Sequence, residues 1–215
     1  MMNFAQIPLI HKVKRQVELV QRRAYSTASS TSHSVSFSSP ASVGNLMVVW
    51  CSFASTTNTM SGPSGWTNPE FRDQGTLNSY MWYRIKQEGD TDSWTFTTTP
   101  TVILRIVMYE VTGINQTSPV SATGSNQSGI VGTLAASSAA LDVPDNAYAI
   151  AFISTAGAIT LSSMTNSFAS FFPNTGTAGD ESGVRSYDAD VTAQNTTITW
   201  APNRAVNTGL IVIQP

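Results

Sequence analysis

Val102–Gly113, with the sequence VILRIVMYEVTG, carries the strongest structural signal in the chain. It is the longest run rich in β-branched and aromatic residues, it follows Pro100 and it ends at a glycine, so it predicts one long strand. Side chains alternate between the two faces of a strand, and both faces are mainly apolar here. Such a strand belongs in the middle of a sheet that is covered on both sides. Its two charged residues, Arg105 and Glu110, fall on opposite faces and need partners.

Short apolar or alternating runs recur along the rest of the chain, separated by Gly, Asn, Ser, Thr and Pro. The second half repeats this rhythm more weakly, and no helical pattern separates the runs, so βαβ units are not expected. The sequence therefore predicts an all-β domain, a two-sheet β-sandwich with jelly-roll-like connections, in preference to a closed barrel. Strands are expected near residues 34–38, 46–54, 78–86, 93–98, 131, 147–154, 168–172, 184–187, 196–200 and 209–213.

Charge is scarce and unevenly distributed. Charged residues form 11% of the 215 residues, against about 25% in a typical soluble domain. Residues 1–23 contain five Lys or Arg and one acidic residue, a net charge of +4, which leaves −6 on the rest of the chain. A basic segment on an acidic body implies that the two meet different surroundings. No segment has the roughly 18 apolar residues of a membrane-spanning helix, and no apolar core of a secretory signal is present, so no membrane is expected.

Residues 1–33 are predicted to be a basic N-terminal arm and linker, ahead of a β-sandwich domain at residues 34–215. Apolar residues at steps of three and four after Pro8 predict that the arm is partly a short amphipathic helix. The helix could pack on its own domain, but we favour docking on a neighbouring subunit, because the following STASSTSHS resembles a spacer. The basic residues lack interleaved aromatics, so nucleic acid is not an expected partner. The predicted contact residues are Ile7, Ile10, Lys12, Val13, Lys14, Arg15, Val17, Val20, Arg22, Arg23 and Tyr25.

Residue types that commonly perform catalysis or bind metals are sparse. The two histidines, His11 and His33, lie in the predicted arm and linker, which leaves the body without the usual general base. The single cysteine, Cys51, lies in an apolar run and is expected to be a buried thiol. We expect no catalytic residue, no metal and no cofactor. Two acidic pairs could bind Ca²⁺, although solvated turn residues explain them better: Asp90 with Asp92, and Asp188 with Asp190.

Glu110 and several aromatic residues each have a functional interpretation and a structural one. As a catalytic acid, Glu110 would require a second carboxylate within about 10 Å, and the sequence offers none in phase with it. We expect it to pair instead with Arg84 or Lys86 of a nearby strand. Trp66 is a candidate ligand-binding aromatic, although large aromatics at alternating strand positions are more often core residues. The other members of this aromatic set are Tyr80, Trp82 and Trp94.

The order of these segments resembles a β-sandwich module found in many bacteriophage structural proteins. The residues that carry the resemblance are the apolar LMVVWCSFA, the GPSGWT turn, YMWYRIK, SWTFTTT and IVMYEVTG, and in the second half AYAIAFISTAG and NTGLIVIQP. The resemblance covers roughly residues 34–215. It implies a virion protein, because such modules occur as capsid decoration (cement) proteins and as parts of tails or fibres, and it provides no catalytic residues.

The resemblance and the basic arm together suggest a non-enzymatic structural protein that decorates and cements a phage capsid. Its expected partners are the major capsid protein and copies of itself, as a homotrimer, and its expected location is the virion, after assembly in the host cytoplasm. The alternative is a tail or fibre component that binds a host-surface glycan through exposed aromatics such as Trp66 and the loops at residues 56–64 and 115–129. A third class, a glycoside-active enzyme that uses Glu110, has the least support.

Overall fold

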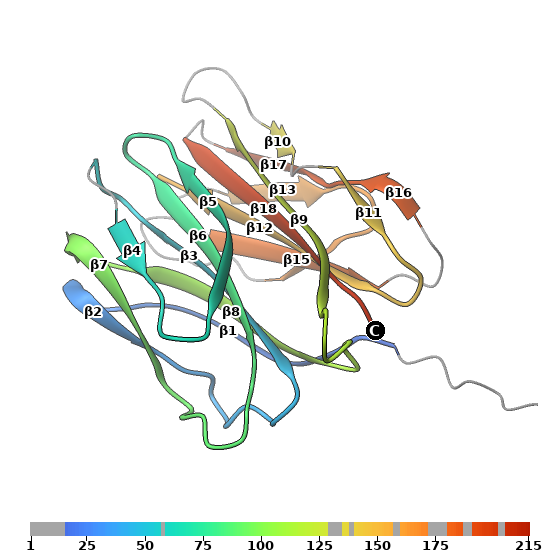
Figure 1. The fold of residues 1–215 in the computed structure, drawn as a ribbon. Helices are drawn as coiled ribbons and strands as arrows, with labels where there is room; N and C mark the ends of the chain where they lie inside the picture. The colour runs from blue at the N-terminus through green and yellow to red at the C-terminus, as the bar shows by residue number, and fades with distance from the viewer. Residues whose placement is uncertain are drawn as a thin grey trace, which may run out of the picture.

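The computed structural model describes residues 16–56, 59–128, 135–137, 140–156, 160–171, 180–186, 191–201 and 205–215. Every regular element in these ranges is a β-strand, and each strand pair is antiparallel. The all-β prediction is therefore confirmed. Among these residues there is also no helix with the length and apolarity needed to cross a bilayer. The strands form five sheets that lie in successive layers (Figure 1).

Sheet A contains the strand around which the sequence is organised. Its order is β1-β8-β3-β6-β5, so β8 lies between two neighbours. The predicted stretch is divided, because Val102 ends the preceding strand and β8 begins only at Arg105. The bounds are β1 Glu18–Ser26, β3 Leu46–Phe53, β5 Thr67–Asp73, β6 Asn78–Ile85 and β8 Arg105–Thr112.

Both faces of β8 are covered, as the sequence predicts. Ile106 and Met108 belong to one buried apolar cluster, and Val107, Tyr109 and Val111 belong to another. The first cluster separates sheet A from sheet B, whose order is β2-β7-β4. The strands of sheet B are β2 Ser30–Val35, β4 Thr59–Ser61 and β7 Trp94–Val102.

The second cluster separates sheet A from sheet C, which has the order β14-β15-β12-β18-β9. Trp50 of β3 stacks on Phe152 of β12 with ring centroids 5.4 Å apart, and its indole Nε1 donates to Ser154 Oγ at 2.6 Å. Sheets A and C thus pack face to face as a β-sandwich. The strands of sheet C are β9 Val120–Ser128, β12 Tyr148–Thr155, β14 Ala169–Phe171, β15 Asp180–Ser186 and β18 Val206–Ile213.

Sheets D and E lie beyond sheet C on the far side from sheet A (Figure 1). A third apolar cluster joins Leu210 and Val212 of β18 to Val143 of β11. The prediction of a two-sheet sandwich therefore accounts for the A–C pair, and the outer layers extend it. Sheet D has the order β10-β17-β13, with β10 Ala135–Ser137, β13 Thr160–Met164 and β17 Thr197–Ala201, and sheet E pairs β11 Leu141–Val143 with β16 Val191–Gln194.

The first and second halves of the chain share one strand arrangement. Strands β1–β8 form sheets A and B, whereas β9–β18 form sheets C, D and E. The order β1-β8-β3-β6-β5 in sheet A has the same form as β9-β18-β12-β15-β14 in sheet C, and β2-β7-β4 in sheet B matches β10-β17-β13 in sheet D. Among the described strands of the second half, only β11 and β16 lack a counterpart in the first half.

The strand registers repeat as well. Leu46 pairs with Ile85 and Val111, and Tyr148 pairs in the same way with Ser186 and Ile213. Each half has a β-bulge in its first strand, directly after the residue that pairs with Val111 or Ile213. The turns before β3 and β12 also share one backbone bond, Asn45 N to Ser42 O and Ala147 N to Pro144 O. The two halves are therefore structural repeats that pack through sheets A and C.

The predicted boundary between arm and domain is wrong for residues 17–33. Strand β1 is the edge strand of sheet A and pairs with β8 from Glu18 to Ser26, and β2 begins at Ser30. The predicted amphipathic helix is likewise wrong where it reaches Val17 and Val20. The apolar spacing that resembles a helix arises because the bulge after Leu19 inserts one residue and interrupts the alternation of the strand.

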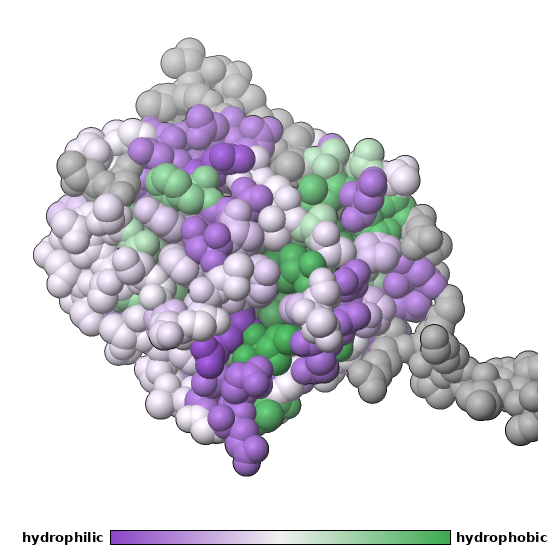
Figure 2. Space-filling view, in the orientation of Figure 1, coloured by the Kyte–Doolittle hydropathy of each residue, from purple (hydrophilic) through white to green (hydrophobic). Residues whose placement is uncertain are grey.

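The outer face of sheet B has a distinctive composition. Apart from Pro100, its exposed side chains are serines and threonines, and most of the surface over β2, β4 and β7 is accordingly pale in Figure 2.

Candidate functional site

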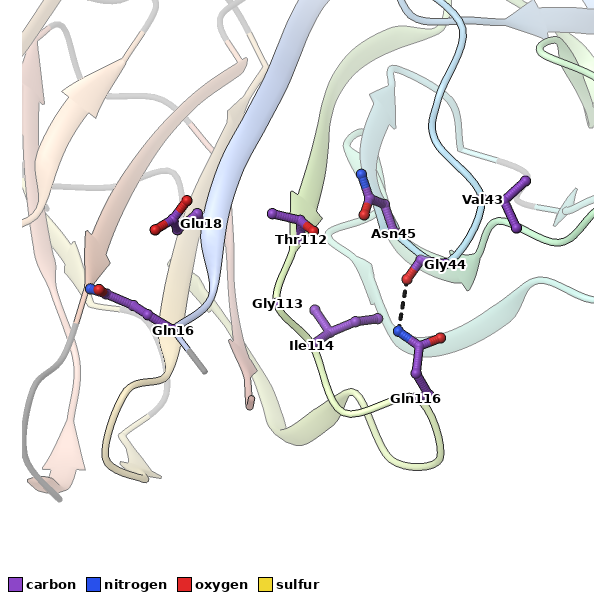
Figure 3. Close-up of a pocket in the computed structure, with 9 residues that line it drawn as sticks. All are labelled: Gln16, Glu18, Val43, Gly44, Asn45, Thr112, Gly113, Ile114 and Gln116. Atoms are coloured by element: carbon purple, nitrogen blue, oxygen red, sulfur yellow. Dashed lines mark hydrogen bonds between the residues drawn. The ribbon is translucent and has the colours of Figure 1, made fainter. Parts of the chain in front are cut away.

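A pocket of about 450 Å³ opens at the end of the domain where β1 begins (Figure 3). Its walls come from the start of β1, the end of β8 with the turn that follows, and the turn before β3 (Figure 3). Gln116 donates from Nε2 to the carbonyl oxygen of Gly44 at 2.9 Å, which ties two of these walls together. The lining residues are Gln16, Glu18, Val43, Gly44, Asn45, Thr112, Gly113, Ile114 and Gln116.

The start of β1 is fixed at the junction of the two halves. Gly113, which follows β8, has a φ of +74°, and a Cβ atom there would collide with the carbonyl oxygen of Gln16. Val17 donates its backbone N–H to the carbonyl oxygen of Asn146 in the second half, at 3.3 Å. Val17 is also almost completely buried. Residues 1–15 therefore join the folded domain at a point that contacts both halves.

The predicted arm residues within the described ranges belong to the domain. Val20 lies in the bulge of β1 and is 48% exposed. Arg23 donates from Nη1 to the carbonyl oxygen of Ser36 at 2.8 Å, and its guanidinium lies over the ring of Tyr25. The hydroxyl of Tyr25 accepts a hydrogen bond from Ser36 N, and burial raises its pKa. The remaining predicted contacts lie outside the described residues: Ile7, Ile10, Lys12, Val13, Lys14 and Arg15.

Glu110 is fully buried beside this end of the domain. Its carboxylate accepts hydrogen bonds from Ser42 N at 2.7 Å, Asn45 Nδ2 at 2.7 Å and Gln21 Nε2 at 2.5 Å. We refer to Gln21, Ser42, Asn45 and Glu110 as the Glu110 cluster. The carboxylate has no exposed surface with which to contact a substrate, and its donors connect β1, β8 and the turn before β3. The geometry of Glu110 therefore fits a structural role.

The predicted partners of Glu110 are wrong, because Arg84 and Lys86 bind other acids. Arg84 forms a two-pronged ion pair with Asp90, at 3.0 Å from Nε and 2.6 Å from Nη2. Lys86 Nζ lies 2.8 Å from Asp92 Oδ1. Strand β3 separates β6, which contains Arg84, from β8.

Asp90 and Asp92 are consequently ion-paired rather than simply solvated. Burial alone would raise the pKa of Asp90, but the hydrogen bonds from Gln87 N and Arg84 outweigh it and hold the pKa below its usual value. The other predicted acidic pair, Asp188 and Asp190, lies outside the described residues. None of the described residues forms a group of three or more side chains suited to a metal ion.

Trp66, the candidate ligand-binding aromatic, lies in the core between sheets A and B, as the favoured core interpretation predicts. It is 8% exposed and makes edge-to-face contacts with Trp94 and Phe96, each with ring centroids 5.5 Å apart. Trp82 also packs edge to face on Phe96, with ring centroids 5.8 Å apart. These aromatics join two layers of the protein, which is the core alternative that their alternating positions favour.

The structure also tests the predictions for Cys51 and His33. Cys51 is buried, as expected. His33 is buried rather than placed in a linker, and its ring nitrogens lie 2.8 Å from Thr27 Oγ1 and 3.0 Å from Thr98 Oγ1. Because Thr27 Oγ1 also accepts from Leu104 N, its own proton is available to Nδ1, and Nε2–H can then donate to Thr98. His11 lies outside the described residues.

Sequence reasoning missed the partners of Glu110 and the glycine at the junction. Gln21, Ser42 and Asn45 are ordinary polar residues in the sequence, and only the order of strands in sheet A brings them together. Gly113 did have a signal, since a glycine directly after a long strand marks a turn with unusual backbone angles.

Comparisons with protein-family models, with curated proteins and with solved structures found no match to the chain.

Proposed function

We propose that this chain is a non-enzymatic structural protein of a phage virion, which decorates the capsid shell and stabilises it. Residues 1–15 provide the attachment, and the two β-sheet repeats form a stiff body on the outside of the shell. The partners are the major capsid protein and other copies of the chain, arranged as a homotrimer or another symmetric cluster.

The observation that carries this proposal is the point where residues 1–15 meet the domain. The carbonyl oxygen of Gln16 lies against Gly113 of the first half, and Val17 donates its N–H to the carbonyl oxygen of Asn146 in the second half. A pull on the N-terminal segment would therefore load sheet A through the antiparallel pairing of β1 with β8, and the second half through the bond from Val17 N to Asn146 O. A linked second contact raises the effective concentration of the domain at its neighbour, which is how a short arm strengthens a lattice.

The charges of residues 1–15 support the same role. These residues include Lys12, Lys14 and Arg15 and no acidic residue. Arg22 and Arg23, the other basic residues of the predicted arm, lie in β1 instead. The basic segment is therefore shorter than the sequence suggested, and it precedes a body with an excess of acidic residues. Such a separation of charge favours contact between the segment of one copy and the body of another.

Strand pairing supports the jelly-roll part of the proposal. A jelly roll can be described as a rolled-up hairpin of eight strands, in which the first strand pairs with the eighth, the second with the seventh and the third with the sixth. The first half has the pairs β1–β8, β2–β7 and β3–β6. The second half has the corresponding pairs β9–β18, β10–β17 and β12–β15. Jelly rolls are common in viral capsids and in lectins.

Deletion of residues 1–15 tests the attachment. Capsids assembled without this chain would be incubated with full-length or truncated protein and sedimented. We expect the truncated protein to keep its thermal unfolding midpoint, because β1 is intact, and to lose binding to the particles. Full occupancy by the truncated protein would overturn the proposal.

Two variants distinguish the possible causes of a loss of binding to the particles. Deletion of residues 1–26 removes β1 and is expected to unfold the first half. Its thermal unfolding and particle binding therefore show what a folding defect would produce. The triple substitution Lys12→Gln, Lys14→Gln and Arg15→Gln keeps the length of the segment and removes its charge. We expect weaker binding that no longer depends on salt, whereas unchanged binding would assign attachment to the apolar residues Ile7 and Ile10.

A further inference from the structure

The outer face of sheet B presents a regular array of hydroxyl groups. In β7, the exposed residues Thr95, Thr97 and Thr99 alternate with the buried Trp94, Phe96 and Thr98. The strand registers place exposed hydroxyl residues of β2 and β4 directly beside them. The three rows of this hydroxyl array are Ser34 beside Thr95, then Ser32, Thr97 and Ser61, then Thr99 beside Thr59.

The array has a fixed spacing and a uniform chemistry. Neighbouring strands lie about 4.8 Å apart, and side chains two residues apart on a strand lie about 6.7 Å apart. Each hydroxyl group can both donate and accept a hydrogen bond. None of the seven positions has a charged or aromatic side chain, and most of the surface over this sheet is pale in Figure 2. The aromatic residues of β7 point the other way, into the core.

The chemistry of the array restricts its partner. A strongly charged polymer would find no opposite charge on these strands. An apolar partner would have to remove water from seven hydroxyl groups without replacing their hydrogen bonds, which is costly. A neutral chain of sugar units offers hydroxyl groups that donate and accept at regular intervals. It could replace the water at each row with direct or water-mediated hydrogen bonds.

We propose that the hydroxyl array is a binding surface for a neutral polysaccharide. The polysaccharide chain lies across the strands of sheet B and exchanges hydrogen bonds with the threonines of β7 and with their neighbours in β2 and β4. Recognition does not involve Trp66, whose ring faces the core. The proposal is independent of attachment through residues 1–15, because sheet B does not contribute to the pocket where β1 begins.

Retention on insoluble polysaccharides tests this proposal. The full-length protein would be incubated with microcrystalline cellulose, chitin or cross-linked dextran, and the protein left in solution would be measured over a range of salt concentrations. We expect saturable retention on at least one of them, with little dependence on salt. The triple variant Thr95→Val, Thr97→Val and Thr99→Val keeps the shape of the array and removes three hydroxyl groups. It is expected to bind at least about tenfold more weakly.

Two further variants guard against trivial explanations. The matched control Thr95→Ser, Thr97→Ser and Thr99→Ser keeps the hydroxyl groups and should retain binding. The single substitution Thr97→Lys puts a charge in the central row and should abolish binding without exposing apolar surface. Thermal unfolding of each variant checks that sheet B is intact.

Three results would overturn the proposal. The first is no retention on any of the three polymers, and the second is equal retention of the valine variant and the full-length protein. The third is a concentration-dependent dimer that is lost in the valine variant, since it would assign the face to a second copy of this chain.

Discussion

Glu110 in the first half and Val212 in the second half occupy equivalent places in the two repeats. Glu110 pairs with Met47 and Gln21 on its two sides, and Val212 pairs with Ala149 and Ala122 in the same manner. Both side chains are fully buried. One is a carboxylate held by three hydrogen bonds, and the other belongs to an apolar cluster.

The neighbours of these two residues differ in a coordinated way. Gln21 corresponds to Ala122, and Asn45 corresponds to Ala147. Ser42, whose N–H donates to Glu110, corresponds to Pro144, which has no N–H. Every donor to the carboxylate is thus absent where the carboxylate is absent.

This position fastens the segment before β3 or β12 to its sheet, through polar contacts in the first half and apolar contacts in the second. A buried carboxylate is costly unless its hydrogen bonds are complete, and an apolar replacement of the whole cluster can be equally stable. Glu110 is therefore explained without catalysis. The second half fastens its segment with Val143, Val212 and the added sheet E.

The substitution Glu110→Val is expected to have the largest effect on stability. It leaves Ser42 N and the buried Asn45 Nδ2 without their acceptor, whereas Gln21 Nε2 keeps the carbonyl oxygen of Ser39. An unpaired buried donor costs about 1–3 kcal/mol, so we expect the free energy of unfolding, measured with urea, to fall by about 3 kcal/mol.

Exchange of the whole Glu110 cluster tests whether the polar contacts of the first half and the apolar contacts of the second are interchangeable. The variant Gln21→Ala, Ser42→Pro, Asn45→Ala and Glu110→Val copies the second half into the first. It should be more stable than Glu110→Val alone by about 2 kcal/mol, because no donor is left unpaired. If the fourfold variant is as unstable as the single one, the two clusters are not interchangeable.

The interface between the halves allows a second experiment with a smaller effect. Gly209 of β18 occupies the place of Val107 in β8, and a Cβ atom there would lie 2.5 Å from Cζ3 of Trp50. Gly209→Ala should therefore lower the free energy of unfolding by about 2 kcal/mol through overpacking. Trp50→Phe removes the part of the ring that collides, so the double variant should show a favourable coupling in a double-mutant cycle. Additive effects would mean that contact with the Trp50 ring is not the reason for a glycine at position 209.

The smallest expected effect is a dependence on pH that is confined to the first half. Burial lowers the pKa of His33 below its usual value of 6.5, so the unfolded chain takes up a proton more readily than the folded one. Stability should be complete above about pH 6.5 and should decrease as the pH falls below it. The second half has no histidine. Amide protection, measured relative to the intrinsic exchange rate at each pH, should therefore fall in β2 and β7 but not in β12 and β18 on mild acidification, and His33→Gln should remove the difference.

The strands with two apolar faces were predictable from sequence, because burial on both sides leaves a continuous apolar run. This applies to β3, β8 and β12, each fully or almost fully buried. The edge strand β1 was not predictable. Its bulge at Val20 shifts the alternation by one residue, and the resulting spacing of Val17 and Val20 imitates a helix.

The candidate site was less predictable than the fold. Sequence pattern does not give the order of strands in a sheet, so Arg84 was paired with Glu110 although β3 lies between their strands. The GPSGWT turn does not predict whether Trp66 is buried or exposed either, because its burial depends on the packing of sheet B against sheet A. The equivalence of Glu110 and Val212 required the register of both halves.

A density map of the assembled virion would show directly whether the chain lies on the capsid shell. We expect the two stacked repeats on the outer surface of the shell, with continuous density from Val17 through residues 15 to 1 onto a capsid subunit or a neighbouring copy. Density for the chain on the tail or fibre, or a particle that lacks the chain, would contradict the claim.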